Sequence, residues 1–193
     1  MNSEEWTVPA TEHQPVRGQR VKKGLVIVNT GMGKGKSTAA MGLMMRAWGR
    51  GMNVQMYQFL KHETANFGEH RAAKKMGIPI IAMGDGFTWL SKDRERTQQL
   101  ALLQWERCKA AILAGEYDII ILDEFTYLLH YGWLAVSDAI DVLKQRREMM
   151  HVVITGRYAA PELVDYADLV TEMTLVKHPY REQGIKAQPG VEF

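Results

Sequence analysis

The stretch LVIVNTGMGKGKST, residues 25–38, joins an apolar run to a glycine-rich turn that leads into Lys36 and Ser37. The apolar run is typical of a buried strand, and the residues after Ser37 have the spacing of an amphipathic helix. In such a strand–turn–helix unit, successive backbone N–H groups and the positive end of the helix dipole converge on one point. The stretch therefore predicts a loop that holds a triphosphate.

Two lysines and a serine indicate the chemistry of this loop. Lys36 would neutralise phosphate charge, and the Ser37 hydroxyl would ligate a magnesium ion. Lys34 adds a second cation, which suits a highly charged polyphosphate. The common pattern G-x-x-x-x-G-K-[ST] has glycine where this chain has Thr30, so we expect the first turn of the loop to have a different shape.

Short apolar runs alternate with helical patterns from Gly24 onward. The expected strands are 25–29, 53–59, 78–83, 118–124, 151–157 and 168–173, and the expected helices are 37–48, 67–77, 93–114, 137–148 and 161–167. Strands that are apolar on both faces and alternate with helices are typical of a parallel sheet covered by helices. We expect one three-layer α/β domain over residues 24–193, with helices on both faces of the sheet and the RecA-like fold of P-loop NTPases.

Residues 1–23 differ from the rest of the chain. They contain Pro9, Pro15 and Gly18, show little periodicity and end in the basic run VRGQRVKK. This composition predicts a flexible N-terminal arm. The alternative is an arm that orders over a ligand or a partner subunit, with Trp6 as its anchor.

Composition narrows the class of protein. The chain has 193 residues, of which 46% are hydrophobic and 24% charged, with 24 basic against 22 acidic side chains. A net charge of +2 argues against a protein whose main task is to coat nucleic acid. No apolar run approaches the roughly 20 residues that span a bilayer, and residues 1–13 have no apolar core of a secretory signal. We expect a soluble, cytoplasmic protein that binds neither nucleic acid nor membrane.

The single cysteine, Cys108, excludes an intrachain disulfide and a zinc site with several cysteines. It follows Trp105 by three residues and precedes Ile112 by four, a spacing that predicts a buried helix face. The six histidines show no metal-ligand spacing.

A second motif, DIIILDE at residues 118–124, places Asp123 and Glu124 at the carboxyl end of a buried strand. Ligands of open α/β sheets gather at that edge, and a carboxylate there can hold magnesium directly or through water. A helix N-cap formed by Asp123 or Thr126 is the alternative. If Glu124 activated water the protein would be an ATPase, and the two motifs alone do not exclude that.

Six motifs follow one another in order along the chain. They are TGMGKGKSTAA at 30–40, QFLK at 58–61, GFTW at 86–89, LDEFTY at 122–127, ITGR at 154–157 and VKHPYREQGIKAQPGVEF at 176–193. Together they resemble the motifs of one family, the P-loop ATP:corrinoid adenosyltransferases. Phosphate loops are common, but GFTW together with the C-terminal motif is highly specific. The resemblance covers residue 24 onward.

The resemblance implies an unusual reaction for a P-loop protein. A reduced cobalt(I) corrinoid, such as cobalamin, cobinamide or cobyrinic acid diamide, attacks the 5′ carbon of ATP, and the whole triphosphate leaves. The reaction serves adenosylcobalamin biosynthesis or salvage. The resemblance also implies Mg²⁺ or Mn²⁺ as cofactor, a reduced flavoprotein as electron donor and a homodimer.

The resemblance also assigns roles to individual residues. ATP would contact Gly31, Met32, Gly33, Lys34, Gly35, Lys36, Ser37, Thr38 and Arg157. The metal would be held by Ser37 and Glu124, with Asp123 beside them, and a surface salt bridge is the alternative role of Arg157. Phe87 and Trp89 match the aromatic residues that lie under the corrinoid and keep the lower axial ligand off cobalt. Lys36, Glu124, Phe87 and Trp89 would be the catalytic residues.

Three features depart from the family pattern. Met32 stands where asparagine is expected, so one polar contact near the phosphates is missing. His62 follows QFLK where the family often has glycine. The two prolines of the N-terminal arm argue against copying a helical lid from relatives.

Three other classes of protein fit the phosphate loop and the acidic strand. Thymidine kinases of similar size pair the same two motifs but usually carry zinc cysteines, which this chain lacks. A RecA-like motor ATPase would have a basic or aromatic track for nucleic acid, and only scattered Lys and Arg residues are present. A non-enzymatic protein is the third class, either a nucleotide-gated corrinoid carrier or a regulatory ATP-binding module. A carrier would need the same pockets as the enzyme, so the motifs do not separate the two.

Overall fold

A parallel sheet forms the centre of the molecule, and its strands run in the order β3-β2-β4-β5-β1-β6. The computed structural model describes residues 21–62, 64, 66–84 and 94–192. Within these residues the strands are β1 (Val26–Thr30), β2 (Val54–Gln58), β3 (Ile80–Ala82), β4 (Ile119–Asp123), β5 (His151–Thr155) and β6 (Leu169–Glu172). Each predicted strand is confirmed, with its ends shifted by a few residues at most.

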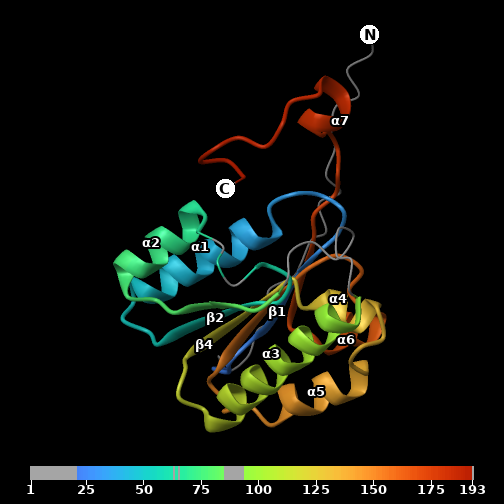
Figure 1. Cartoon of the computed structure of the whole chain (residues 1–193). Helices are drawn as coiled ribbons and strands as arrows, with labels where there is room; N and C mark the ends of the chain where they lie inside the picture. The colour runs from blue at the N-terminus through green and yellow to red at the C-terminus, as the bar shows by residue number, and fades with distance from the viewer. Residues whose placement is uncertain (1–20, 63, 65, 85–93, 193) are drawn as a thin grey trace.

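Helices cover both faces of the sheet (Figure 1). One face carries α1 (Lys36–Trp48) and α2 (Gly68–Met76), and the other carries α3 (Arg94–Ala114), α5 (Val136–Lys144) and α6 (Pro161–Tyr166). The predicted three-layer α/β class is therefore confirmed, and it is consistent with the fold of P-loop NTPases.

The alternation of side chains along β4 shows why its sequence is apolar throughout. Ile119 and Ile121 pack in the layer that contains α1 and α2, whereas Ile120 and Leu122 pack in the layer of α3 and α5. Successive residues of a strand point to opposite faces, so a strand covered on both faces has no solvent-facing position. The predicted place of Cys108 is confirmed, because its side chain is buried on α3 in the second layer.

Two short helices were not predicted, namely α4 (Thr126–His130) and α7 (Pro179–Gln183). Helices of five residues are too short to show a 3.6-residue period. The helix expected at 137–148 ends earlier, at Lys144. There the Arg146 guanidinium donates hydrogen bonds to the carbonyl oxygens of Leu143 and Gly24, so it ties the helix end to the chain before β1.

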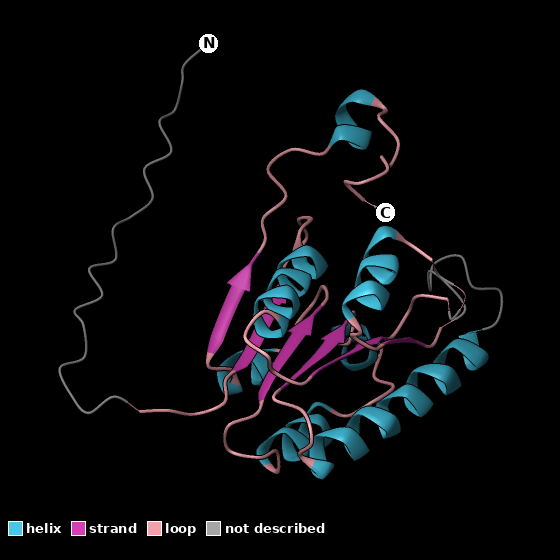
Figure 2. Cartoon of the chain, turned by 90° about the vertical axis from the view of Figure 1, so that its left-hand side faces the viewer, coloured by secondary structure: helices cyan, strands magenta, loops and turns pink. Residues whose placement is uncertain are grey.

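The chain after β6 returns over the phosphate loop. The Gly33 N–H donates to the Met173 carbonyl oxygen at 2.6 Å, and Lys34 forms an ion pair with Glu192 at 2.6 Å. This C-terminal segment, residues 173–192 with α7, lies beyond the ends of the strand arrows, at the carboxyl edge of the sheet (Figure 2). In the described part of the chain, no helix has the length and apolar character to cross a membrane.

Candidate active site

The phosphate loop begins one residue later than the common pattern. Thr30 is still the last residue of β1, where its hydroxyl accepts a hydrogen bond from the Ala159 N–H at 3.3 Å. The turn starts at Gly31, whose φ of 95° favours glycine, and a Cβ there would lie 2.6 Å from the Met173 carbonyl oxygen. The displaced glycine therefore follows from the packing of the C-terminal segment against the loop.

Lys36 lies inside the loop rather than in solvent. Its side chain is 7% exposed, and its ammonium donates to the carbonyl oxygens of Gly31 and Gly33 at 2.8 and 2.6 Å. Burial lowers the pKa of Lys36, and the neighbouring Glu124 carboxylate partly offsets this. An ammonium held by carbonyl dipoles is available to exchange them for phosphate oxygens. Ser37 and Thr38 follow in the first turn of α1.

Asp123 is fixed by two side chains at the ends of the neighbouring strands. Its Oδ1 accepts a hydrogen bond from the Thr155 hydroxyl at 2.7 Å, and its Oδ2 accepts one from the Gln58 amide at 3.0 Å. Gln58 is the register partner of Asp123 across the β2–β4 pair. The N-cap alternative is wrong, because the N-cap of α4 is Phe125 and the Thr126 hydroxyl donates to the Arg157 carbonyl oxygen.

Glu124 has the features of a residue held for a ligand. Its backbone is left-handed, with φ of 62°, and its N–H donates to the Thr155 hydroxyl at 3.0 Å. Among the described residues its buried Oε2 has no hydrogen-bond partner. Burial and the neighbouring Asp123 charge raise the pKa of Glu124 to about 7, against the opposing effects of Lys36, Lys61 and Arg157. A buried carboxylate oxygen without a partner fits a divalent cation.

Arg157 reaches the same site from the chain that follows β5. It is half-buried and close enough to Lys36 and Glu124 to affect both pKa values. Within the described ranges it takes part in no ion pair, so the salt-bridge alternative finds no support there. Next to it, Tyr158 has φ of 57° and stacks on His130 at 4.3 Å between ring centroids.

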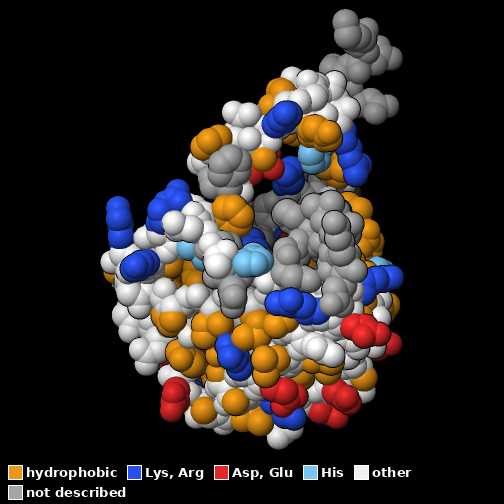
Figure 3. Space-filling view, viewed as in Figure 1, with side chains coloured by type: hydrophobic (Ala, Val, Ile, Leu, Met, Phe, Trp, Pro, Cys, Tyr) orange, Lys and Arg blue, Asp and Glu red, His pale blue; other side chains and the backbone are white. Residues whose placement is uncertain are grey.

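The structure therefore brings together residues 31–38, the acidic pair and Arg157 at one edge of the sheet. Phe87 and Trp89 lie outside the described residues, and their predicted role stays a prediction. Most Lys and Arg side chains of the visible face lie in its upper half, where this edge and the C-terminal segment are, and most Asp and Glu side chains lie in the lower half (Figure 3). Such a charge distribution suits an anionic substrate.

Sequence reasoning missed three residues that the fold adds to this edge. Gln58 and Thr155 hold Asp123, and Lys61 lies near enough to Glu124 to lower its pKa. Gln58 and Lys61 belong to the QFLK motif, so their position in that motif was the available signal. Nothing in the linear sequence indicated that Gln58 contacts the acidic strand, 65 positions away, or that Lys61 lies near it.

The fold and the loop together define a P-loop nucleotide-binding protein of the α/β class. The family described as ATP:corrinoid adenosyltransferase BtuR/CobO/CobP matches residues 22–193. The chain belongs to this family. The predicted resemblance is therefore confirmed, and so is the predicted class of enzyme, a corrinoid adenosyltransferase.

Several curated proteins with the name corrinoid adenosyltransferase are similar to this chain. The protein from Sinorhizobium sp is 43% identical over 175 residues, which cover 89% of this chain and 81% of the relative. The Pseudomonas aeruginosa protein is 38% identical over 186 residues, covering 95% and 91%. Corrinoid adenosyltransferase CobA of Salmonella typhimurium is 37% identical over 172 residues, covering 89% and 87%.

Proposed function

We propose that this protein transfers the 5′-deoxyadenosyl group of ATP to the cobalt(I) ion of a corrinoid and releases triphosphate. The substrate class is a cobalamin, a cobinamide or a cobyrinic acid diamide, and the product serves adenosylcobalamin synthesis or salvage. The observation that carries the proposal is the meeting, at one sheet edge, of the phosphate loop, the buried Lys36 and Glu124, whose Oε2 has no partner among the described residues. Family membership supplies the identity of the acceptor.

The proposed reaction is a displacement at carbon. The electron pair of cobalt(I) forms the cobalt–carbon bond as the bond from C5′ to the triphosphate oxygen breaks, and the triphosphate leaves with that bond's electrons. No proton has to move, so the site needs no general base. The rate depends on groups that stabilise negative charge on the departing oxygen and are already in place.

Lys36 and the loop N–H groups supply this stabilisation. The Lys36 ammonium exchanges the carbonyl oxygens of Gly31 and Gly33 for phosphate oxygens when ATP binds. The Gly33 N–H, which donates to Met173, is a second donor that ATP would compete for. Arg157 and Lys34 add positive charge at the sides of the loop, whereas Met32, 40% exposed, contributes its backbone alone.

Ser37 and Glu124 would hold Mg²⁺ or Mn²⁺ at the triphosphate. The cation would supply charge neutralisation on the leaving group. Both oxygens of Asp123 already accept hydrogen bonds, whereas Oε2 of Glu124 has no partner in the described part of the chain. Glu124 would therefore be the carboxylate that holds the cation, with Asp123 beside it.

The remaining proposals rest on the family resemblance or, for the cytoplasmic location and for residues 1–23, on composition. Phe87 and Trp89 would lie under the corrinoid and keep the lower axial ligand away from cobalt. A reduced flavoprotein would supply electrons, the protein would act as a cytoplasmic homodimer, and residues 1–23 would form an arm outside the catalytic domain.

An anaerobic assay tests the function directly. The protein is mixed with ATP, Mg²⁺ and a chemically reduced corrinoid, and both the cobalt–carbon product and inorganic triphosphate are measured. We expect the two products in equal amounts. Formation of ADP without triphosphate would refute the proposal and indicate a kinase or an ATPase.

Lys36→Ala tests the part of the mechanism that this structure carries. We expect a loss of at least about 100-fold in kcat/KM, because a charged donor to the leaving group is removed. Lys144→Ala is the matched control, since Lys144 lies on α5 and pairs only with Asp141 among the described residues. Equal activity of the two variants would contradict the assigned role.

A further inference from the structure

A chain of hydrogen bonds connects α2 to the acidic pair. The Gln58 side chain is fully buried at the end of β2, and its amide donates to Oδ2 of Asp123 at 3.0 Å. The carbonyl oxygen of the same amide lies 2.8 Å from Nε2 of His70 in α2. Nδ1 of His70 lies 3.2 Å from the Phe67 backbone nitrogen, so this series of hydrogen bonds ends at the start of α2.

The contact between Phe67 and His70 determines which groups donate and which accept along this series of hydrogen bonds. The Phe67 N–H can only donate, so Nδ1 of His70 accepts and the imidazole carries its proton on Nε2. Nε2–H then donates to the Gln58 carbonyl oxygen, and this orients the Gln58 NH₂ group toward Asp123. Burial lowers the pKa of His70, in keeping with a neutral ring.

The other oxygen of Asp123 is held with the same directionality. The Thr155 hydroxyl accepts from the Glu124 N–H and donates to Oδ1 of Asp123. The two carboxylate oxygens thus each accept from an oriented donor, one of which depends on His70. Beside them lies Oε2 of Glu124, which has no hydrogen-bond partner within the described ranges.

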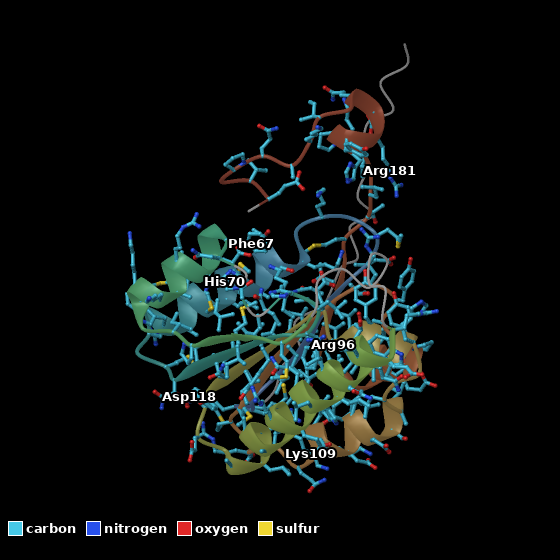
Figure 4. All side chains as sticks on the ribbon, viewed as in Figure 1. Phe67, His70, Arg96, Lys109, Asp118 and Arg181 are labelled. Atoms are coloured by element: carbon cyan, nitrogen blue, oxygen red, sulfur yellow. The ribbon has the colours of Figure 1, made fainter. Side chains whose placement is uncertain are left out.

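A second contact holds α2 at the same place. Lys61, just beyond β2, forms an ion pair with Glu69 at 2.9 Å, and its ammonium lies 5.4 Å from the centre of the Phe67 ring. Phe67 and His70 lie together at the amino-terminal end of α2 (Figure 4). Capping of α2 requires only the Phe67 contact of His70, so the contact with Gln58 calls for another explanation.

We propose that Gln58 and His70 are positioning residues that orient the Asp123 carboxylate for the metal–triphosphate complex and couple the start of α2 to it. The inference rests on the proposed function in one respect, the divalent cation at the acidic pair. Residues that orient the groups around a metal commonly change its affinity by about 10- to 100-fold when they are replaced.

Two substitutions of His70 separate positioning from capping. His70→Asn places an acceptor near the position of Nδ1, so it preserves the helix cap but removes the donor to Gln58. His70→Gln places an NH₂ group near the position of Nε2, so it preserves the donor but loses the cap. His151→Asn is a matched control, because Nδ1 of His151 also accepts a backbone N–H, from Leu25, at the opposite edge of the sheet.

The readout is the affinity of Mn²⁺ in the presence of ATP, measured by electron paramagnetic resonance, together with the thermal midpoint of each variant. We expect His70→Asn and Gln58→Leu to weaken Mn²⁺ binding by about 10-fold. His70→Gln is expected to keep the affinity within about 2-fold while lowering the thermal midpoint, and His151→Asn to bind Mn²⁺ like the wild type.

Equal losses of Mn²⁺ affinity in both His70 variants, or no loss in either, would overturn the inference. Wild-type protein that releases triphosphate but binds no Mn²⁺ with ATP would also overturn it, while the transferase function would stand. Conversely, a clear difference between the two variants in a protein that releases no triphosphate would support the positioning role and refute the proposed function.

Discussion

At the scale of single residues, Glu124 departs most from what stability alone would favour. A non-glycine residue with φ of 62° costs about 1–2 kcal/mol. Its buried Oε2, which has no partner in the described part of the chain, adds a desolvation penalty. Asp123, the adjacent residue in the chain, satisfies both of its oxygens. Residues that are strained and unsatisfied in this way cluster at functional sites, because binding the ligand compensates for their cost.

Replacement of Glu124 by glutamine should therefore stabilise the metal-free protein while it abolishes activity. In the unfolded chain the carboxyl group loses its proton near its ordinary pKa of 4.5, but in the folded protein the pKa is about 7. The folded state then binds more protons between these values, so stability falls as pH rises through this window. We expect Glu124→Gln to gain on the order of 2 kcal/mol at pH 8 and little at pH 4.5.

Urea unfolding in the presence of a chelator measures this difference at each pH, and triphosphate release measures the activity. The wild type at the same pH values is the control. A variant that is less stable than the wild type at pH 8 would show that Glu124 stabilises the fold, contrary to its assignment as a ligand-binding group.

At the scale of elements, close approach between backbone segments positions Arg157. Gly156 follows β5 with φ of 138°, and a Cβ at this position would lie 2.1 Å from the Thr126 hydroxyl of α4. That hydroxyl donates to the Arg157 carbonyl oxygen. The glycine of the TGR motif thus lets α4 and the chain after β5 meet, and this meeting brings Arg157 to the phosphate loop.

Gly156→Ala should destabilise the protein by about 3 kcal/mol, since the new methyl group overlaps Thr126 and alanine disfavours this φ. Gly42→Ala is the matched control: Gly42 is exposed in α1 and an added Cβ meets no atom within 4 Å. The control should gain about 0.5–1 kcal/mol, because alanine is the better helix former.

Urea midpoints of the two alanine variants and the wild type provide the test. If both substitutions shift the midpoint in the same direction, contact with Thr126 does not decide the identity of residue 156.

At the scale of the whole molecule, the chain closes on itself at the carboxyl edge of the sheet. Gly33 donates to Met173, and Lys34 pairs with Glu192. The core below this edge consists of two apolar layers separated by the sheet. Opening the core therefore requires the helices on at least one face to separate from the strands, which is expected only on extensive unfolding.

Cys108 reports this opening, because its side chain is fully buried and burial raises the pKa of its thiol. A protonated, inaccessible thiol does not react with disulfide reagents. We expect the native protein to react only as fast as it unfolds, and ATP at about 100 times its dissociation constant to slow the reaction about 100-fold.

The reaction is followed by the absorbance of the released thiolate, with fully unfolded protein as the reference for an accessible thiol. Fast reaction of the native protein would contradict the burial of Cys108. In Lys36→Ala, the protection by ATP should be lost, because that variant lacks the ammonium proposed to bind the phosphates.

The sequence by itself determined the phosphate loop, the α/β class, the family and the place of Cys108. Each of these follows from residues close together in the sequence, either from the spacing of apolar residues along a strand or helix or from a motif of a few adjacent residues. Such local patterns can be read without coordinates. Asp123 and Glu124 were recognised in the same way, as a pair at the end of an apolar strand.

Only the tertiary structure decided how the members of this pair differ. Asp123 is bound by Gln58, 65 positions away, and by Thr155, 32 positions away, whereas Glu124 Oε2 is left without a partner among the described residues. The same holds for Thr30, whose place in the loop depends on a segment about 140 positions later. Such contacts depend on strand order and register, which bring distant residues to one sheet edge, and no local pattern specifies them.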